Sequence, residues 1–100
     1  MSGYSGLQAR VQQMRDKGRD DIIDAHSHSM EHRAELGRSS LAGCFFCSNV
    51  FDPNQITHWV DDGRCALCPS CGTDSVVGDA SGFPITDKRF LREMNRFWFC

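Results

Sequence analysis

The chain has 100 residues, of which 40% are hydrophobic and 24% are charged, which is typical of one small globular domain. A net charge of -2 and an isoelectric point of about 6.0 argue against a protein that holds duplex nucleic acid by bulk attraction to phosphates. No apolar run approaches the roughly 18 residues of a membrane span, and the first residues contain no apolar signal segment. We therefore expect a cytoplasmic protein that does not associate with a membrane.

Upstream of the first cysteine the sequence predicts helices. Apolar residues at Leu7, Val11 and Met14 keep a helical spacing. A second, long helix is predicted from about Asp21 to Leu36, where a glycine follows as a stop signal. These two helices make the N-terminal part of the chain a helical segment.

Four of the six cysteines carry the clearest functional signal. Cys44 and Cys47 form one C-x-x-C pair, and Cys68 and Cys71 form another after twenty intervening residues. This spacing is typical of a zinc site, in which two tight turns direct four thiolates at one metal ion about 2.3 Å from each sulfur. We predict one structural zinc ion held by these four residues. Thiolate ligands also favour a reducing, cytoplasmic compartment.

The other two cysteines are assigned no ligand role. Cys65 forms a third C-x-x-C with Cys68, but Pro69 and Gly72 make the later turn the better metal-binding knuckle. We expect Cys65 to be a small buried strand residue, with a spare ligand or a redox thiol as the alternative. Cys100 is expected to extend freely at the terminus.

The rest of the chain predicts a hairpin, a loop and a helix. Residues 56–60 alternate like a strand, residues 61–63 read Asp-Asp-Gly as a hairpin turn, and residues 64–67 return toward the second cysteine pair. Residues 73–85 are predicted to be a glycine-bearing loop, and residues 87–98 a helix. Its apolar stripe faces the core and comprises Phe90, Leu91, Met94, Phe97 and Trp98.

These elements predict a small α+β domain. A zinc ribbon or treble-clef-like β-hairpin is flanked by a long N-terminal helix and a short C-terminal helix. Residues 1–5 are expected to be disordered, residues 6–40 to form the helical segment, and residues 41–100 to form the zinc-binding ribbon with the last helix. We expect residues 6–100 to be one folded unit.

Three histidines are candidates for chemistry beyond the zinc site. On the predicted long helix, His28 and His32 lie one turn apart beside Glu35, and we predict that this polar face is the functional surface. The same stretch matches the H-x-x-E-H motif of inverted zinc proteases, and with Asp24 it offers a second metal site. The alternative is a solvated helix face. His58 lies in the hairpin, where fold-level analogy suggests the general base of a nuclease.

The last helix carries a set of basic residues, Lys88, Arg89, Arg92 and Arg96. The simplest interpretation is a solvated face that balances Asp87 and Glu93. The alternative is a surface for an acidic partner or for RNA, because Phe97, Trp98 and Phe99 follow directly.

From His28 onward the sequence resembles a family of small bacterial cytoplasmic proteins with a zinc-ribbon or treble-clef-like fold. Its motifs are a helix reading H-S-x-x-H-R-x-E, a C-x-x-C, a tryptophan-bearing hairpin, the string A-L-C-P-x-C-G-x-D-S-V-V-G-x-x-S-G and a closing W-F. Here they are His28-Ser29, His32-Arg33, Glu35, Cys44, Cys47, Trp59, Ala66 to Gly72, Asp74 to Gly78, Ser81-Gly82 and Trp98-Phe99. The chain departs from the pattern at Ser70, in place of an aromatic residue, and at the additional Cys65. The resemblance implies a fold and a metal and supplies no activity.

The function predicted from the sequence is a non-enzymatic module, with a protein partner expected and a nucleic acid as the other possibility. The alternative is a small metal-dependent hydrolase or nuclease that uses His28, His32 or His58. The sequence assigns no residue a definite catalytic role.

Overall fold

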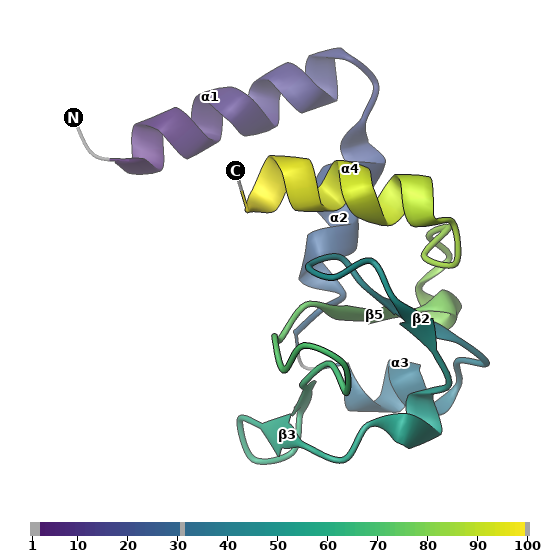
Figure 1. The fold of residues 1–100 in the computed structure, drawn as a ribbon. Coiled ribbons are helices and arrows are strands. Elements are labelled where there is room, and N and C mark those ends of the chain that lie inside the picture. The colour runs from purple at the N-terminus through teal and green to yellow at the C-terminus, as the bar shows by residue number, and fades with distance from the viewer. Residues whose placement is uncertain (1–2, 31, 100) are drawn as a thin grey trace.

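The computed structural model describes residues 3–30 and 32–99. The elements in chain order are α1 (Gly3–Asp16), α2 (Asp20–Ser27), α3 (Arg33–Gly37), β1 (Ala42–Cys44), β2 (Val50–Phe51), the short 3₁₀ helix η1 (Pro53–Gln55), β3 (Trp59–Val60), β4 (Cys65–Ala66), β5 (Val76–Gly78), the short 3₁₀ helix η2 (Asp79–Ser81) and α4 (Lys88–Trp98). In Figure 1, α1 and α4 lie at one end of the molecule, and α3 lies with the strands at the other end. α2 runs from the first group toward the second.

The hydrophobic core joins α2 and α4 to the sheet. Ile22 of α2 and both Leu91 and Met94 of α4 are fully buried. The indole Nε1 of Trp98 donates a hydrogen bond of 3.1 Å to the carbonyl oxygen of Ile22. The stripe predicted for the last helix is confirmed as its inner face, and Asp87 caps this helix by accepting from the amide of Arg89 at 2.9 Å.

The long helix predicted from Asp21 to Leu36 is wrong, because the chain leaves the helix after Ser27 and re-enters one at Arg33. The side chain of Ser29 accounts for part of this break. Its Oγ donates to the carbonyl oxygen of His26 at 2.6 Å, and a serine that bonds the backbone in this way competes with helix continuation. The break separates α2 from α3 and changes the surroundings of the histidines in between.

α1 contacts the core through only a few side chains. Val11 and Met14 are half-buried and pack against the core cluster, whereas Leu7 is 38% exposed. The helix begins at Gly3, so residues 3–5, which were expected to be disordered, are helical. Residues 1–2 lie outside the described part of the chain.

Two small antiparallel sheets carry the cysteine turns. β1 is the central strand of the sheet β2-β1-β5, with Ala42 opposite both Phe51 and Gly78. Residues 73–85 are therefore more than the predicted loop, because they contain β5 and η2. Val76 and Val77 are fully buried in β5, and burial of this β-branched pair favours a strand over a loop.

The predicted β-hairpin is confirmed as β3 and β4, which pair with Trp59 opposite Ala66. Asp61, Asp62 and Gly63 form its turn, with φ angles of 54°, 57° and 81°. No helix in the described part of the chain is long and apolar enough to cross a membrane. The structure thus agrees with the predicted α+β class.

Candidate metal centre

Four cysteine side chains from two separate turns converge on one point. The Sγ atoms of Cys44, Cys47, Cys68 and Cys71 all lie within 4.8 Å of one another. The Sγ atoms of Cys44 and Cys71 are 3.6 Å apart, and those of Cys47 and Cys68 are 3.7 Å apart. These distances exceed the roughly 2.05 Å of a disulfide bond, and all four thiols are free. The structure therefore brings together the four predicted ligands, whose donor set suits a metal ion such as zinc.

The first cysteine pair lies in the turn between β1 and β2. The amide of Cys44 donates to the carbonyl of Asn49 at 3.0 Å, and the amide of Ser48 donates back to the carbonyl of Cys44 at 2.8 Å. Inside this loop the amide of Phe46 points at the Sγ of Cys44, 3.4 Å away. Ser48 closes the turn with a φ of 64°, an uncommon value for a residue other than glycine.

The second cysteine pair, between β4 and β5, repeats this geometry bond for bond. The amide of Cys68 donates to the carbonyl of Thr73 at 2.9 Å, and the amide of Gly72 donates to the carbonyl of Cys68 at 2.9 Å. The amide of Ser70 points at the Sγ of Cys68, again at 3.4 Å, and Gly72 closes the turn with a φ of 78°. The chain therefore contains two copies of one knuckle, a repeat that sequence reasoning missed because the residues between the cysteines differ.

Burial differs between the two cysteines of each knuckle: the first ones, Cys44 and Cys68, are buried, whereas Cys47 is half-buried and Cys71 is exposed. Cys44 is completely buried, and this burial raises the pKa of its thiol far above the usual range, although the hydroxyl of Ser75, 3.1 Å away, opposes the effect. Cys71 is exposed, and its partial burial also raises the pKa. Hydrogen bonds with the hydroxyl and amide of Thr73, and with the side chains of Cys44 and Cys68, outweigh that effect and bring the pKa of Cys71 to about 7. A buried thiolate at Cys44 needs an adjacent cation, which a metal ion supplies.

Cys65 lies outside the four-cysteine cluster, as predicted. It is 4% exposed and forms part of β4, which agrees with a small buried strand residue. Cys100 lies outside the described residues.

The histidine face expected on the long helix is not formed. His28 does meet Glu35, because its Nδ1 is 3.0 Å from both carboxylate oxygens. His32, however, is 4% exposed, and neither ring nitrogen has a hydrogen-bond partner among the residues that the structure describes. Burial is the main cause that lowers the pKa of His32; Glu35 opposes this shift and His28 adds to it. The structure thus places His28 and Glu35 together, half-buried, and buries His32 apart from solvent.

The remaining candidates for metal or acid–base chemistry lie elsewhere. His58 is exposed, with Nδ1 3.0 Å from the hydroxyl of Thr57. Asp24 pairs with Arg15 at 3.3 Å. Within residues 3–30 and 32–99, only the four-cysteine group brings three or more ligand side chains close enough for a metal. Glu31, the acid of the H-x-x-E-H match, lies outside the described residues.

Comparison with known proteins finds no match to this chain among family models, curated proteins or solved structures. Functional conclusions therefore depend on the geometry of the chain itself.

Proposed function

We propose that the four cysteines hold one zinc ion, and that this ion is structural. A tetrahedron with zinc–sulfur bonds of about 2.3 Å has edges of about 3.8 Å. Two of the sulfur–sulfur distances, 3.6 and 3.7 Å, are close to that edge. Four protein ligands also leave no open coordination position for a substrate, which is typical of structural rather than catalytic zinc.

The duplicated knuckle is the observation that carries this proposal. Each knuckle directs an amide at the first sulfur of its pair, Phe46 at Cys44 and Ser70 at Cys68. Such N–H groups stabilise thiolate charge around a metal. Both ligand pairs lie in turns between strands, which supports a zinc-ribbon arrangement.

We further propose that the zinc-held domain is a non-enzymatic binding module in the cytoplasm, where thiols stay reduced. Its partner is a protein or a nucleic acid. The alternative hydrolase or nuclease needs histidines that share a solvent-filled site, but His32 is buried and His58 stands exposed on a separate hairpin. We also propose, from the sequence resemblance described above, that the chain is related to small bacterial cytoplasmic proteins with a zinc-ribbon or treble-clef-like fold.

Metal analysis of the purified chain tests the proposal directly. We expect one zinc per chain, and we expect Cys68→Ser to lose both the metal and the fold. Cys65→Ser is the matched control, because it makes the same change three residues earlier and should keep the metal. A content of two zinc ions per chain would favour the enzyme, and metal loss from Cys65→Ser would refute the ligand assignment.

A further inference from the structure

Charge is divided very unevenly along the sequence. Eight of its eleven basic residues fall in residues 6–19 and 88–98, which contain only two of the thirteen acids. They are Arg10, Arg15, Lys17, Arg19, Lys88, Arg89, Arg92 and Arg96. Because α1 and α4 lie at the same end of the molecule, these basic residues gather there, where Asp20, Asp21 and Asp24 of α2 pair with Arg15 and Arg19 (Figure 1). The net charge of -2 therefore hides a local surface that attracts anions.

The basic residues of α4 are exposed and without ion pairs to the described carboxylates. Its four exposed cations, Lys88, Arg89, Arg92 and Arg96, which we call the basic stripe, make no ion pair with any described carboxylate. By contrast, Arg15 pairs with two aspartates, and Arg19 pairs with Asp21 and with Glu93. Four such cations thus share one face of α4, and Lys17, which is also exposed and has no ion pair with a described carboxylate, lies across the neighbouring cavity.

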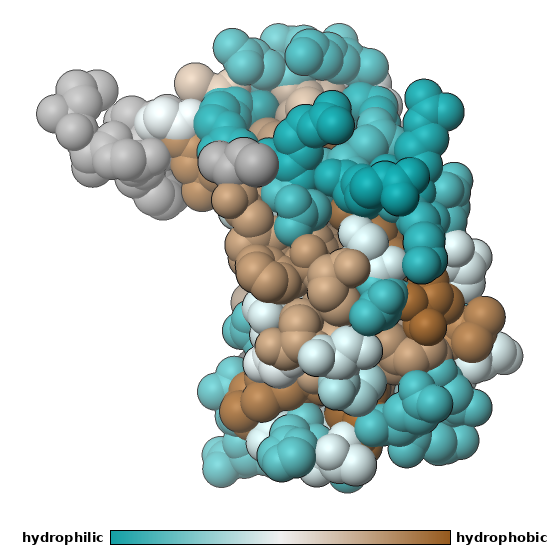
Figure 2. Space-filling view, viewed as in Figure 1, coloured by the Kyte–Doolittle hydropathy of each residue, from teal (hydrophilic) through white to brown (hydrophobic). Residues whose placement is uncertain are grey.

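An exposed aromatic pair continues this face. Arg92, Asn95, Arg96 and Phe99 follow one another at helical spacing, so they share one side of the helix. The rings of Phe99 and Phe46 meet edge to face at 4.9 Å, and both residues stay more than 40% exposed, at 44% and 46%. The side-chain amide of Asn95 holds the knuckle there, since it donates to the carbonyl of Phe46 at 2.9 Å. Figure 2 shows apolar surface directly below the hydrophilic surface of the helical end.

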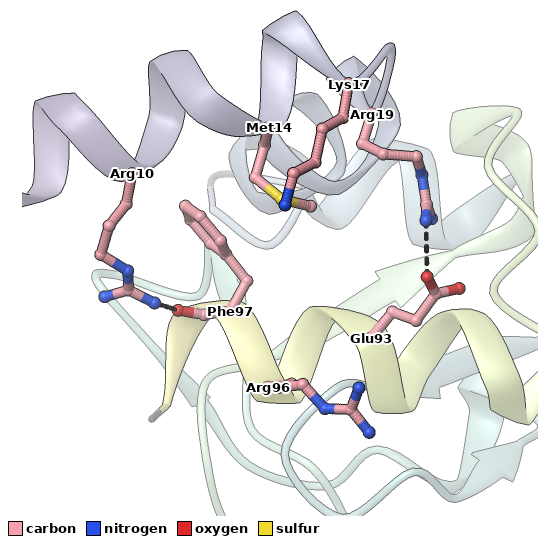
Figure 3. A pocket seen from close by; sticks show the side chains of 7 residues that line it. All are labelled: Arg10, Met14, Lys17, Arg19, Glu93, Arg96 and Phe97. Carbon is pink, nitrogen blue, oxygen red and sulfur yellow. Dashed lines mark hydrogen bonds and ion pairs between the residues drawn. The ribbon is translucent and has the colours of Figure 1, made fainter.

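A cavity between α1 and α4 adds to the positive surface. It has a volume of about 350 Å³, with Met14 and Phe97 among its apolar lining and Lys17 and Arg96 among its cations. Figure 3 shows Phe97 and Lys17 directed into the space between the helices, and Arg96 directed away from α1. Arg96 therefore belongs both to the basic stripe and to the rim of this cavity.

We propose that this face of α4 binds single-stranded nucleic acid, with phosphates on the basic stripe and bases on Phe46 and Phe99. The assignment rests on the proposed binding-module function and names its partner. A cationic path next to exposed aromatic rings is the combination by which proteins hold single strands without reading sequence. Three of the four cations are arginines, whose planar guanidinium groups bind phosphate in bidentate geometry. An acidic protein would use the same charges but has no need of two exposed rings held edge to face.

Fluorescence anisotropy with a labelled oligouridylate of about 12 nucleotides tests this proposal on the zinc-loaded full chain. If four phosphates are neutralised, the logarithm of the binding constant should fall against the logarithm of salt concentration with a slope of about -2.8. An oligothymidylate of equal length should bind with a similar slope, because the proposed contacts are to phosphates and base faces. If the protein bound only the oligouridylate or only the oligothymidylate, it would have to contact groups other than phosphates and base faces, and the proposed mode of binding would be refuted.

Matched variants separate the stripe from overall charge. We expect Arg92→Gln/Arg96→Gln to make the slope shallower by about 1.4, since two phosphate contacts are lost. Arg33→Gln/Arg38→Gln removes the same charge from exposed positions in and next to α3, at the other end of the molecule, and should leave the slope unchanged. Phe46→Ser, which introduces the residue found at the same place in the second knuckle, should weaken binding about ten-fold through lost stacking.

Three outcomes would overturn the proposal. The first is the absence of strand binding at low salt by protein that keeps its zinc and melting temperature, which would leave the metal-held module intact. The second is an equal loss of binding in both double variants, which would indicate attraction to net charge alone. The third combines two results: polyglutamate competes for the protein as strongly as unlabelled oligouridylate does, and Phe46→Ser does not change the affinity for the oligonucleotide. Together they would indicate an acidic protein partner.

Discussion

The two knuckles of the metal centre share one backbone geometry but have opposite surroundings. In the first, Cys44 and Phe45 are buried, and the tip is tied to α4 through Asn95. In the second, the first cysteine, Cys68, is also buried, but Pro69, Ser70, Cys71 and Gly72 are all exposed. The backbone bonds and the amide–sulfur distances nevertheless agree within about 0.1 Å. The geometry of a knuckle is therefore set locally, by two cysteines three apart and a left-handed residue after them.

The energetics of each knuckle, in contrast, are set by what packs against it. Burial drives the pKa of the Cys44 thiol up, while hydrogen bonds bring that of Cys71 to about 7. Cys44 is the first cysteine of its knuckle and Cys71 is the second cysteine of the other, so pairs of variants can measure how a buried and an exposed ligand differ.

The largest effect is expected from removing a ligand. Structural zinc contributes on the order of 10–16 kcal/mol in finger peptides, whereas small domains have only about 5–15 kcal/mol of total stability. Both Cys44→Ser and Cys71→Ser should release zinc and lose cooperative unfolding, as seen by metal analysis and circular dichroism. Cys44→Ser should be the more damaging, because it also places a hydroxyl in a buried position. Greater damage from Cys71→Ser would contradict the comparison.

The residue after the first cysteine should show the next largest difference. Phe45 is 2% exposed and belongs to the main core cluster, so Phe45→Ala should lower the free energy of unfolding by about 3–5 kcal/mol. Pro69 takes the same place in the second knuckle and is exposed. Pro69→Ala should therefore change the free energy of unfolding by less than about 1 kcal/mol. Urea denaturation of the zinc-loaded variants measures both values. Similar losses would show that Phe45 does not anchor its knuckle.

A smaller, pH-dependent effect is expected at the hairpin that carries the second knuckle. The start of α3 holds this hairpin, because the amide of His32 donates to the carbonyl of Arg64 at 3.0 Å. Burial lowers the pKa of the His32 ring in the folded chain below its ordinary value of 6.5. As the pH falls below about 6.5, the unfolded chain binds a proton that the folded chain does not, so the free energy of unfolding falls. The loss approaches about 1.4 kcal/mol for each pKa unit of lowering.

His32→Leu tests this effect by removing the ring nitrogens that lack partners. Between about pH 7.5 and 5.5 the variant should lose less stability than the parent, with zinc content measured at each pH. His58→Gln is the control, because it removes an exposed imidazole that lies directly before β3 of this hairpin. If His32→Leu follows the same pH curve as the parent, the buried ring does not carry the acid sensitivity.

The smallest effect is expected at the left-handed position that ends each knuckle. An alanine at Gly72 meets no atom within 4 Å, so Gly72→Ala should cost only the backbone strain, about 1 kcal/mol. Ser48→Gly makes the reverse change in the first knuckle and should be neutral or slightly stabilising. Thermal melts of the zinc-loaded proteins compare the two. Equal destabilisation by both would mean that the two turns are not conformationally equivalent.

Local chemistry explains what the sequence could predict. The Cys68-Pro-Ser-Cys71 spacing, the Asp-Asp-Gly turn and the apolar stripe of the last helix each act within a few residues, and all three are present in the structure. The strands β1, β2 and β5 went unrecognised because no turn signal like Asp-Asp-Gly links them, and because β5 pairs with β1 from a distant part of the sequence. Val76 and Val77 next to a glycine-rich stretch were the available signal.

The candidate site was predictable in its ligands and not in its surroundings. The helical spacing of apolar residues predicted a helix that continues through Ser29. The hydroxyl of Ser29 instead donates a hydrogen bond to the carbonyl of His26, which favours a break in the helix there. The burial of His32 depends on how the elements pack, which no single stretch of sequence shows. The basic residues of the last helix were visible in the sequence, but their lack of ion pairs with the described carboxylates was not.

The exposure of Cys71 makes the metal centre open to chemical attack from one side. An oxidant such as a peroxide reaches this sulfur from solvent, whereas Cys44 is enclosed by protein. A sulfenic acid at Cys71 would no longer be a thiolate ligand, and a neighbouring cysteine of the cluster could then condense with it to a disulfide. The second knuckle is therefore the place at which oxidative damage would begin, and mass spectrometry after mild peroxide treatment should find the first added oxygen, or the first disulfide, at Cys71.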